Sequence, residues 1–302
     1  MKINNKLLRF FKIMFYGRYY RAYLKHLCKK NKDYCNIVIF GGAIGDCCIA
    51  MAYLLEFRKK LERKINIIVS ESLKELVQCY DGYDKVTYVS KQAIVHMEFV
   101  TTRKFPWTWY FKQIDTPQLI ITNPWIYLDR ELLKLRDLNC LNIMRDIIYH
   151  LNENVRCQTP QIKYNQNIHI RGKKNILFNP FSNSMQCDPN IFNEIIDYFK
   201  LRGYNLYTNC INNDAFCFPG TERLVSSIFD LYNLIDQFEC IVSIRSGILD
   251  LLASKNIKQI VLYDPNAGYK NLYSLKMWGI NALELYYDDN KIIEKINTFL
   301  EQ

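Results

Sequence analysis

The stretch NIVIFGGAIGD, residues 36–46, decides the fold of this chain. After Asn36 it is continuously apolar up to the glycines, which is typical of a strand buried on both faces of a parallel sheet. Beyond the glycines, apolar residues recur at helical spacing from Ile44 to Leu55. A strand, a glycine turn and a helix in this order predict an α/β fold with a parallel sheet and right-handed crossovers.

The pattern continues on the C-terminal side of this unit. We expect strands at residues 65–69, 86–89 and 118–122, and helical stretches at residues 72–80 and 129–152. Residues 155–174 lose this periodicity and contain Pro160 and Gly172. Such a segment is typical of a domain boundary, which we place between residues 160 and 161.

The second half begins as the first does, with an apolar run at residues 175–178 that leads into a polar turn. Further strands are expected at residues 204–208, 224–226, 240–244, 259–263 and 283–286, and helices at residues 189–202, 230–238, up to 254 and from 290. No sequence repeat relates the halves. The prediction is two Rossmann-like, doubly wound domains, residues 33–160 and 161–302, that face a cleft.

Charge separates the first 32 residues from the rest of the chain. They carry ten of the 40 basic residues and precede the first acidic residue, Asp33, so the remaining 30 basic residues balance the 30 acidic ones. A neutral globular part argues against a nucleic-acid-binding surface spread over the fold. Residues 1–32 alternate bases with apolar and aromatic residues and contain no apolar run long enough for a membrane span.

Two interpretations of this basic segment stay open. As a basic amphipathic segment it would lie on an anionic membrane surface, giving a cytoplasmic protein peripheral on the inner membrane. Alternatively it is a solvated helix packed on the domain, or a frayed leader. The eleven cysteines form no CxxC, and their odd number indicates reduced thiols in a cytoplasmic protein. Four scattered histidines predict no metal site.

The turn Gly41-Gly42-Ala43-Ile44-Gly45-Asp46 is the first candidate site. Glycines allow a tight turn and close approach of a substrate, and ligands bind beyond the carboxyl ends of the strands in open α/β sheets. We expect Gly41, Gly42 and Gly45 to form an acceptor-side loop. Asp46 has two interpretations, a general base for an acceptor hydroxyl or a carboxylate that complements the helix dipole.

Two candidate turns lie in the second half. In Ser243-Ile244-Arg245-Ser246-Gly247, an expected strand leads into a helix start, which favours anion binding with Arg245 as a fork for phosphate oxygens. The alternative is a surface Arg paired with a nearby carboxylate, with Ser246 as an ordinary N-cap. In the turn at residues 179–184, the polar groups of Asn179, Ser182 and Asn183 either hold a sugar or phosphate or are ordinary turn residues.

These three places, in this order, resemble glycosyltransferase family 9, the heptosyltransferase-like enzymes of bacterial lipopolysaccharide assembly. GAIGD at residues 42–46 resembles that family's opening strand–glycine–Asp turn. ILFNP at residues 176–180 resembles its strand ending in a His-Pro-Gly type turn. Residues 229–265 resemble its region around an Asp-Ser-Gly turn, and the likeness runs from about residue 36 to residue 270.

The resemblance implies a GT-B fold and transfer from a nucleotide sugar, with inversion and without a metal or another cofactor. Asp46 matches the position of the family's proposed base, and Ser246 and Gly247 match its diphosphate-binding turn. Two positions depart from the family's pattern: Arg245 stands where the family usually has Asp, and Asp250 where it usually has His. The family's Lys after the His-Pro-Gly turn has no counterpart, so Arg245 is the expected replacement for that charge.

The resulting prediction is a glycosyltransferase of bacterial surface polysaccharide synthesis, acting on lipopolysaccharide, O-antigen or capsule. Its partners would be a nucleotide-sugar donor and a saccharide or lipid-linked saccharide acceptor, with no nucleic acid. The expected donor-side residues are Arg245, Ser246, Gly247, Asp250, Asn179, Ser182 and Asn183. One alternative is a non-catalytic nucleotide- or sugar-binding relative, and another is a Rossmann oxidoreductase, disfavoured because Phe40 occupies the first glycine position of the dinucleotide fingerprint.

Overall fold

The computed structural model describes residues 5–101, 119–123, 139–160, 162, 170, 172, 174–182, 185–266 and 270–302. The chain forms two compact units, Met1–Gln158 and Thr159–Gln302. Among the described residues no helix is both long and apolar enough to cross a membrane.

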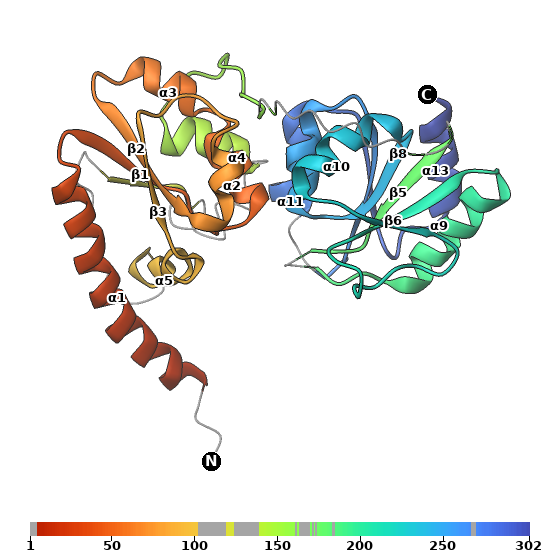
Figure 1. Cartoon of the computed structure of the whole chain (residues 1–302), viewed down its shortest axis with the longest axis horizontal. Helices are drawn as coiled ribbons and strands as arrows, with labels where there is room; N and C mark the ends of the chain where they lie inside the picture. Colours follow the sequence, from red (N-terminus) through yellow and green to blue (C-terminus); the bar gives the residue numbers. More distant parts are fainter. Residues whose placement is uncertain are drawn as a thin grey trace. The chain divides into compact units, whose positions relative to one another are not determined.

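The first unit contains a parallel four-stranded sheet in the order β3-β2-β1-β4 (Figure 1). Its strands are β1 (Tyr34–Val38), β2 (Lys64–Ser70), β3 (Lys85–Val89) and β4 (Leu119–Ile121). Strand β1 is central, and its last four residues are buried, as the apolar run predicted. The strand expected at residues 36–40 therefore begins and ends two residues earlier, and Phe40 belongs to the turn.

The helices of the first unit differ from the expected ones in two places. They are α1 (Asn5–Lys30), α2 (Ile44–Met51), α3 (Leu54–Lys60), η1 (Glu71–Leu73), α4 (Lys74–Val77), α5 (Lys91–Thr101), α8 (Cys140–Asn142) and the π-helical turn η3 (Ile143–Ile148). The first expected helix is interrupted at Ala52 and Tyr53, so it forms α2 and α3. Of the stretch expected as helix at residues 129–152, residues 129–138 lie outside the described residues, and the described remainder contains α8 and η3.

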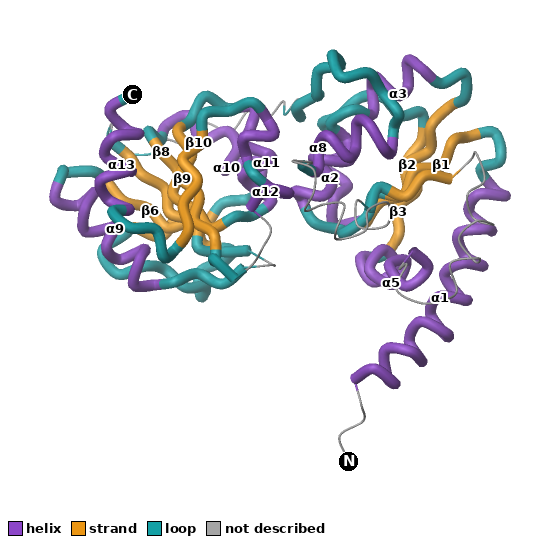
Figure 2. The backbone as a smooth tube through the Cα atoms, turned by 180° about the vertical axis from the view of Figure 1, so that it is seen from behind, coloured by secondary structure: helices purple, strands orange, loops and turns teal. Residues whose placement is uncertain are grey.

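Helices α1 and α5 cover one face of this sheet, and α2 and α4 lie on its other side (Figures 1 and 2). Leu24 and Leu27 of α1 are buried against Val38, Ile68 and the α5 residue Ile94. Burying a leucine contributes about 1.5–3 kcal/mol to folding. The C-terminal half of α1 thus packs on the first unit and contributes to its core, which agrees with the interpretation of this segment as a helix packed on the domain.

The second unit contains a parallel six-stranded sheet in the order β10-β9-β8-β5-β6-β7. Its strands are β5 (Asn175–Asn179), β6 (Asn205–Cys210), β7 (Glu222–Val225), β8 (Cys240–Ile244), β9 (Lys258–Tyr263) and β10 (Ala282–Tyr286). Its helices are α9 (Pro189–Leu201), α10 (Ile228–Leu234), η4 (Ile235–Gln237), α11 (Gly247–Leu251), η5 (Leu252–Ser254), α12 (Lys270–Tyr273), η6 (Leu275–Trp278) and α13 (Ile292–Glu301). All six expected strands are present. This is a doubly wound sheet.

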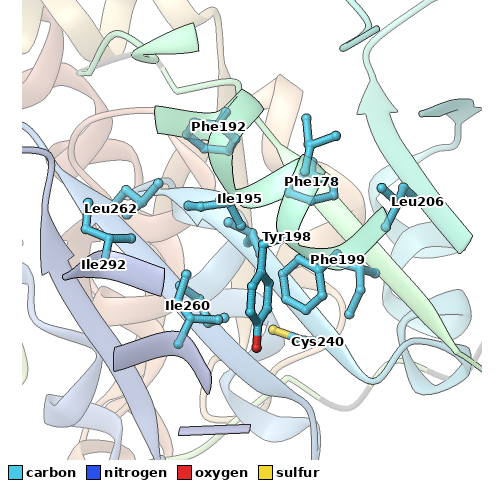
Figure 3. Packing of buried hydrophobic residues seen from close by; sticks show 14 of the residues in the cluster. Phe178, Phe192, Ile195, Tyr198, Phe199, Leu206, Cys240, Ile260, Leu262 and Ile292 are labelled. Carbon is cyan, nitrogen blue, oxygen red and sulfur yellow. The ribbon is translucent and has the colours of Figure 1, made fainter. Parts of the chain in front are cut away.

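An aromatic core lies between this sheet and helices α9 and α13 (Figure 3). Phe178 of β5 meets Phe192 and Phe199 of α9 edge-on at centroid distances of 6.4 and 6.3 Å. Helix α9 begins where the sequence predicted, because Asp188 accepts a hydrogen bond from Asn190 N and Pro189 occupies the first turn. The core fixes β5, and therefore the turn that follows it.

The two sheets share one polar feature that the sequence did not reveal. In the first unit, Asn66 Nδ2 donates to Asn36 Oδ1 at 2.8 Å, and in the second, Asn205 Nδ2 donates to Asn175 Oδ1 at 3.0 Å. Each pair is in register across the first two strands of its unit. A buried amide is costly unless it is hydrogen-bonded, so each pair fixes the register of β1–β2 and β5–β6.

Candidate functional site

The carboxyl edge of the second sheet has a switch point between β5 and β8. From β5 the chain continues outward to β6 and β7, and it then returns to β8 on the other side of β5. In open α/β sheets, ligands bind outside the carboxyl ends of the strands at such a point. Two of the three candidate turns, after β5 and after β8, begin here.

Asn179 joins these two turns by direct hydrogen bonds. Its Nδ2 donates to Ser243 Oγ at 2.8 Å and to Ser246 Oγ at 3.1 Å, although Ser246 is 67 residues away in sequence. Its Oδ1 accepts from Asn209 Nδ2, at the end of β6, at 2.9 Å. Asn179, Ser243 and Ser246 are buried. The structure therefore combines two sequence motifs into one polar cluster, defined by Asn179, Asn209, Ser243 and Ser246.

Arg245 and Asp250 form a bidentate ion pair next to this cluster. Arg245 Nη1 donates to Asp250 Oδ2 at 2.9 Å, and Arg245 Nη2 donates to Asp250 Oδ1 at 2.7 Å. The residues are only 7% and 2% exposed. Arg245 Nη1 also donates to Ser246 O, and Nε donates to Tyr273 O, both at 2.7 Å. Trp278 Nε1 donates to Asp250 Oδ1 at 2.9 Å.

The guanidinium is thus engaged by protein groups on both of its edges, and its charge is compensated at contact distance. A fork that faces phosphate oxygens needs those N–H groups directed outward. In this structure the N–H groups instead donate to the Ser246 carbonyl, to a carbonyl at the end of α12 and to the Asp250 carboxylate. Arg245 therefore fixes the shape of the turn through contacts inside the protein. We call Arg245, Asp250 and Trp278 the clamp. The expected alternative, an Arg paired with a carboxylate, matches this geometry, except that the pair is buried.

The two departures from the family's pattern are the two partners of this ion pair. In the sequence they are two separate departures, five residues apart: an Arg where the family usually has Asp, and an Asp where it usually has His. In the structure one substitution supplies the charge that neutralises the other. A single such change would leave an unpaired charge in a buried place, at a cost of about 3–5 kcal/mol.

A second polar group supports the clamp. Glu284 of β10 accepts hydrogen bonds from Tyr263 Oη at 2.7 Å, Ser274 Oγ at 2.6 Å and Leu275 N at 2.8 Å. Burial raises the pKa of Tyr263, so its phenol stays protonated and donates. These contacts fix the start of η6, and Trp278 is the last residue of that element.

Sequence reasoning missed several of these residues. Asn209 ends an expected strand at the same sheet edge as Asn179, so a search of strand ends for polar residues would have found it. Tyr273, Trp278 and Glu284 carry no local signal, because they reach the site only through packing. Of the other expected donor-side residues, Gly247 begins α11, Ser182 is partly buried, and Asn183 lies outside the described residues.

In the first unit, the turn after β1 holds Asp46 against Gly41. Gly41 and Gly42 have φ angles of +89° and +62°, in the region that favours glycine. A Cβ atom at position 41 would overlap with Asp46 Oδ2, so only glycine leaves the carboxylate room. Gly45 is buried within α2, and Asp46 is half-buried in its first turn.

This turn also lies at a switch point, between β1 and β4. The backbone N of Phe40 donates to Thr122 Oγ1 at 3.1 Å, and that hydroxyl donates to Val38 O at 3.0 Å. Thr122 therefore attaches the glycine turn to the end of β4. Within the part of the chain that the structure describes, no three His, Cys, Asp or Glu residues are grouped to hold a metal ion.

Comparison with known proteins identifies the fold. No family model and no curated protein matches the chain in sequence. Among solved structures, ADP-heptose lps heptosyltransferase II of E. coli is 13% identical with a TM-score of 0.57, over 88% of this chain and 98% of that one. The glycosyl transferase family 9 protein of Veillonella parvula DSM 2008 is 13% identical with a TM-score of 0.52, over 88% and 90%.

A third similar structure, E. coli heptosyltransferase WaaC with ADP, is 12% identical with a TM-score of 0.52, over 88% of this chain and 96% of that one. At such identities the likeness establishes the fold alone. The chain has the GT-B fold of these glycosyltransferases, and the prediction of that fold from the sequence is confirmed.

Proposed function

We propose that this chain is a glycosyltransferase that moves a sugar from a nucleotide-sugar donor to a saccharide acceptor in bacterial surface polysaccharide synthesis. The observation that carries the proposal is the direct contact of Asn179 with Ser246 at the switch point of a GT-B unit. The fold supplies the architecture, and this contact supplies a built polar cluster at the place where α/β sheets bind ligands. Inversion at the anomeric carbon and independence from metal ions belong to the same proposal.

The polar cluster is proposed as the donor diphosphate site. When the sugar–phosphate bond breaks, negative charge grows on the departing diphosphate, and fixed donors facing it lower the barrier. The hydroxyl of Ser246 and the second amide N–H of Asn209 would supply these donors, together with the start of α11 at Gly247. Asn179 would orient both side chains through its hydrogen bonds to them. Arg245 and Asp250 act in this proposal as positioning residues, because their charges compensate one another.

Asp46 is proposed as the general base that takes the proton of the acceptor hydroxyl. An unassisted hydroxyl is a weak nucleophile, and a carboxylate within hydrogen-bond reach accelerates its attack by about 10²–10⁴-fold. The Gly41 turn supports this role, because it leaves the carboxylate room at a sheet edge. The loop of Gly41, Gly42 and Gly45 would lie beside the acceptor.

ADP-linked sugars are the first donors to test. Two of the similar structures are named as E. coli heptosyltransferase WaaC with ADP and with ADP-2-deoxy-2-fluoro heptose. Thermal-shift measurements with ADP, UDP, GDP and their sugar conjugates, with and without EDTA, would identify the donor. We expect one nucleotide series to raise the melting temperature equally in both conditions, and stabilisation that requires a divalent metal would contradict metal independence.

Turnover tests the base directly. With the donor identified, Asp46→Asn is expected to lower kcat by at least about 100-fold while donor binding stays within about twofold. Glu56→Gln, a change of a partly exposed carboxylate on α3 that pairs with Lys59, is the matched control. Full turnover by Asp46→Asn would remove Asp46 from the mechanism.

A non-catalytic binding relative is the second candidate, and the clamp is the observation that favours it. Because Arg245 is engaged with Asp250, the described donor side holds no replacement for the cation that the family's pattern provides. Such a protein would be stabilised by a nucleotide sugar but would release no nucleoside diphosphate with any acceptor extract.

A cytoplasmic location, peripheral on the inner membrane, completes the proposal. A lipid-linked saccharide acceptor would be presented at that surface.

A further inference from the structure

One half of α1 is anchored to the first unit. Leu24 and Leu27 are buried in the core, and Tyr20 Oη lies 3.4 Å from His96 Nδ1 of α5. The Tyr16 ring stacks on the His96 ring at a centroid distance of 4.4 Å. Figure 2 shows α1 beside α5. The orientation of the helix about its own axis is therefore set by packing, and its other side faces solvent.

The outward side carries aromatic rings where a solvated helix would carry polar groups. Phe15 is 75% exposed and Tyr19 is 64% exposed, and residues four apart share one face of a helix. Ala22 and His26 continue this stripe and are also exposed. A phenyl ring in this position, on a helix fixed by its opposite side, leaves most of its apolar surface in water. Contiguous exposed apolar groups with a polar rim mark an interaction surface.

Cations flank the same stripe. Lys25 and Lys29 are exposed and lie one turn apart. Within the described residues neither takes part in an ion pair, and no acidic residue precedes Asp33 in the chain. The ten bases before Asp33 account for the whole net charge of +10. This local positive charge attracts an anionic partner surface.

We propose that the aromatic–basic face of α1, defined by Phe15, Tyr19, Lys25 and Lys29, docks on an anionic phospholipid bilayer. Aromatic rings favour the bilayer interface, where their apolar part leaves water, and bases beside them attract anionic headgroups. A bilayer fits better than nucleic acid, because an outward phenyl ring gains nothing from a phosphate backbone. The helix lies in the plane of the membrane, and the first unit with its Asp46 turn is held at the surface. The docking itself does not depend on glycosyl transfer.

Vesicle sedimentation of the full chain tests this inference. Wild-type protein is expected to sediment with vesicles of phosphatidylcholine and phosphatidylglycerol, to bind pure phosphatidylcholine at least about tenfold more weakly, and to dissociate as salt is raised. Phe15→Ser with Tyr19→Ser, and separately Lys25→Glu with Lys29→Glu, should each weaken binding by about tenfold or more.

Two matched controls separate this face from general effects. Leu201→Ser changes an 87% exposed apolar residue on α9 and should leave vesicle binding unchanged. Lys74→Glu with Lys276→Glu makes the same change of net charge at exposed positions outside α1 and should weaken binding far less. Wild-type binding by both α1 variants, or equal losses in the controls, would overturn the proposal.

A gain of signal provides a second measurement. Phe15→Trp should add a fluorescence component that shifts to the blue with anionic vesicles and is quenched by brominated lipid. No added quenching relative to wild type means that this face does not enter the interface. Tight binding to double-stranded DNA without vesicle binding would assign the face to nucleic acid and would equally overturn the inference.

Discussion

At the scale of single residues, the structure shows that Gly41 does more than form a turn, because it determines where the candidate base Asp46 can lie. Its φ angle of +89° is one reason for glycine, and the Asp46 carboxylate beside its Cα is a second, independent reason. Gly203 has a φ angle of +74° but has no atom within 4 Å of its missing Cβ, so it shares only the first reason. The two positions form a natural matched pair.

Gly41→Ala is therefore expected to lower both stability and turnover, whereas Gly203→Ala should lower stability alone. Each change forces a Cβ into the left-handed region, at a cost of about 1–2 kcal/mol. Only Gly41→Ala also displaces Asp46, which should reduce kcat by at least about tenfold. Urea unfolding and steady-state kinetics on both variants measure the two effects. Equal turnover in the two variants would show that Asp46 placement does not matter.

At the scale of elements, the clamp connects segments that follow two different strands. Arg245 lies in the turn after β8 and Asp250 in α11, while Tyr273 and Trp278 belong to α12 and η6 after β9. The Asn36–Asn66 and Asn175–Asn205 pairs act similarly between neighbouring strands, where they fix register. In both cases polar contacts define how elements meet, and apolar packing supplies most of the stability.

Asp250→Asn should lower the free energy of unfolding by about 3–5 kcal/mol, because it leaves the Arg245 charge buried without its counter-charge. Trp278→Phe removes only one donor to Asp250 and should cost about 1–3 kcal/mol. If the clamp positions the donor turn, Trp278→Phe will also raise the donor KM by about tenfold with little change in kcat. An unchanged donor KM at reduced stability would limit the clamp to a structural role.

Removal of both charges tests the ion pair itself. Arg245→Met combined with Asp250→Leu removes both charges and should be markedly more stable than Asp250→Asn alone. Additive losses in this double-mutant cycle would mean that the two side chains do not interact.

At the scale of the whole molecule, the cysteines are structural thiols. All eleven are thiols outside any disulfide, and six of them are buried. Burial raises the pKa of Cys28 and Cys35 to about 11, and that of Cys187 to about 12. A high pKa keeps these thiols protonated and slow to react at neutral pH.

This sets a pH dependence of stability. The folded-state pKa values of Cys28 and Cys35 lie above the ordinary value of 9.0, so the unfolded chain loses these protons first. Their contribution is complete below pH 9 and is lost as the pH rises through 11. The free energy of unfolding measured with urea should therefore fall between pH 9 and pH 11, and Cys35→Ser should make this fall smaller. Stability that stays constant from pH 9 to pH 11 would contradict the burial of these thiols.

The resemblance to glycosyltransferase family 9 implied the GT-B fold, and the sequence alone determined the parallel sheets and the glycine turn before Asp46. Those features are local: apolar runs report strands buried on two faces, and a turn with positive φ angles needs glycine. It also identified the two donor-side turns, since each follows an expected strand. The order of strands then implies that these turns share one sheet edge.

Only the tertiary structure decided which groups meet there. The contact of Asn179 with Ser246 spans 67 residues, and Arg245 bonds to Tyr273 of α12, which follows a different strand, so no local pattern encodes these contacts. From the sequence, Arg245 either faced an anionic ligand, which a basic residue at a helix start favours, or paired with a carboxylate at the surface. Folding brought a carboxylate within 2.7 Å of it, and a buried charge is stable only beside its counter-charge.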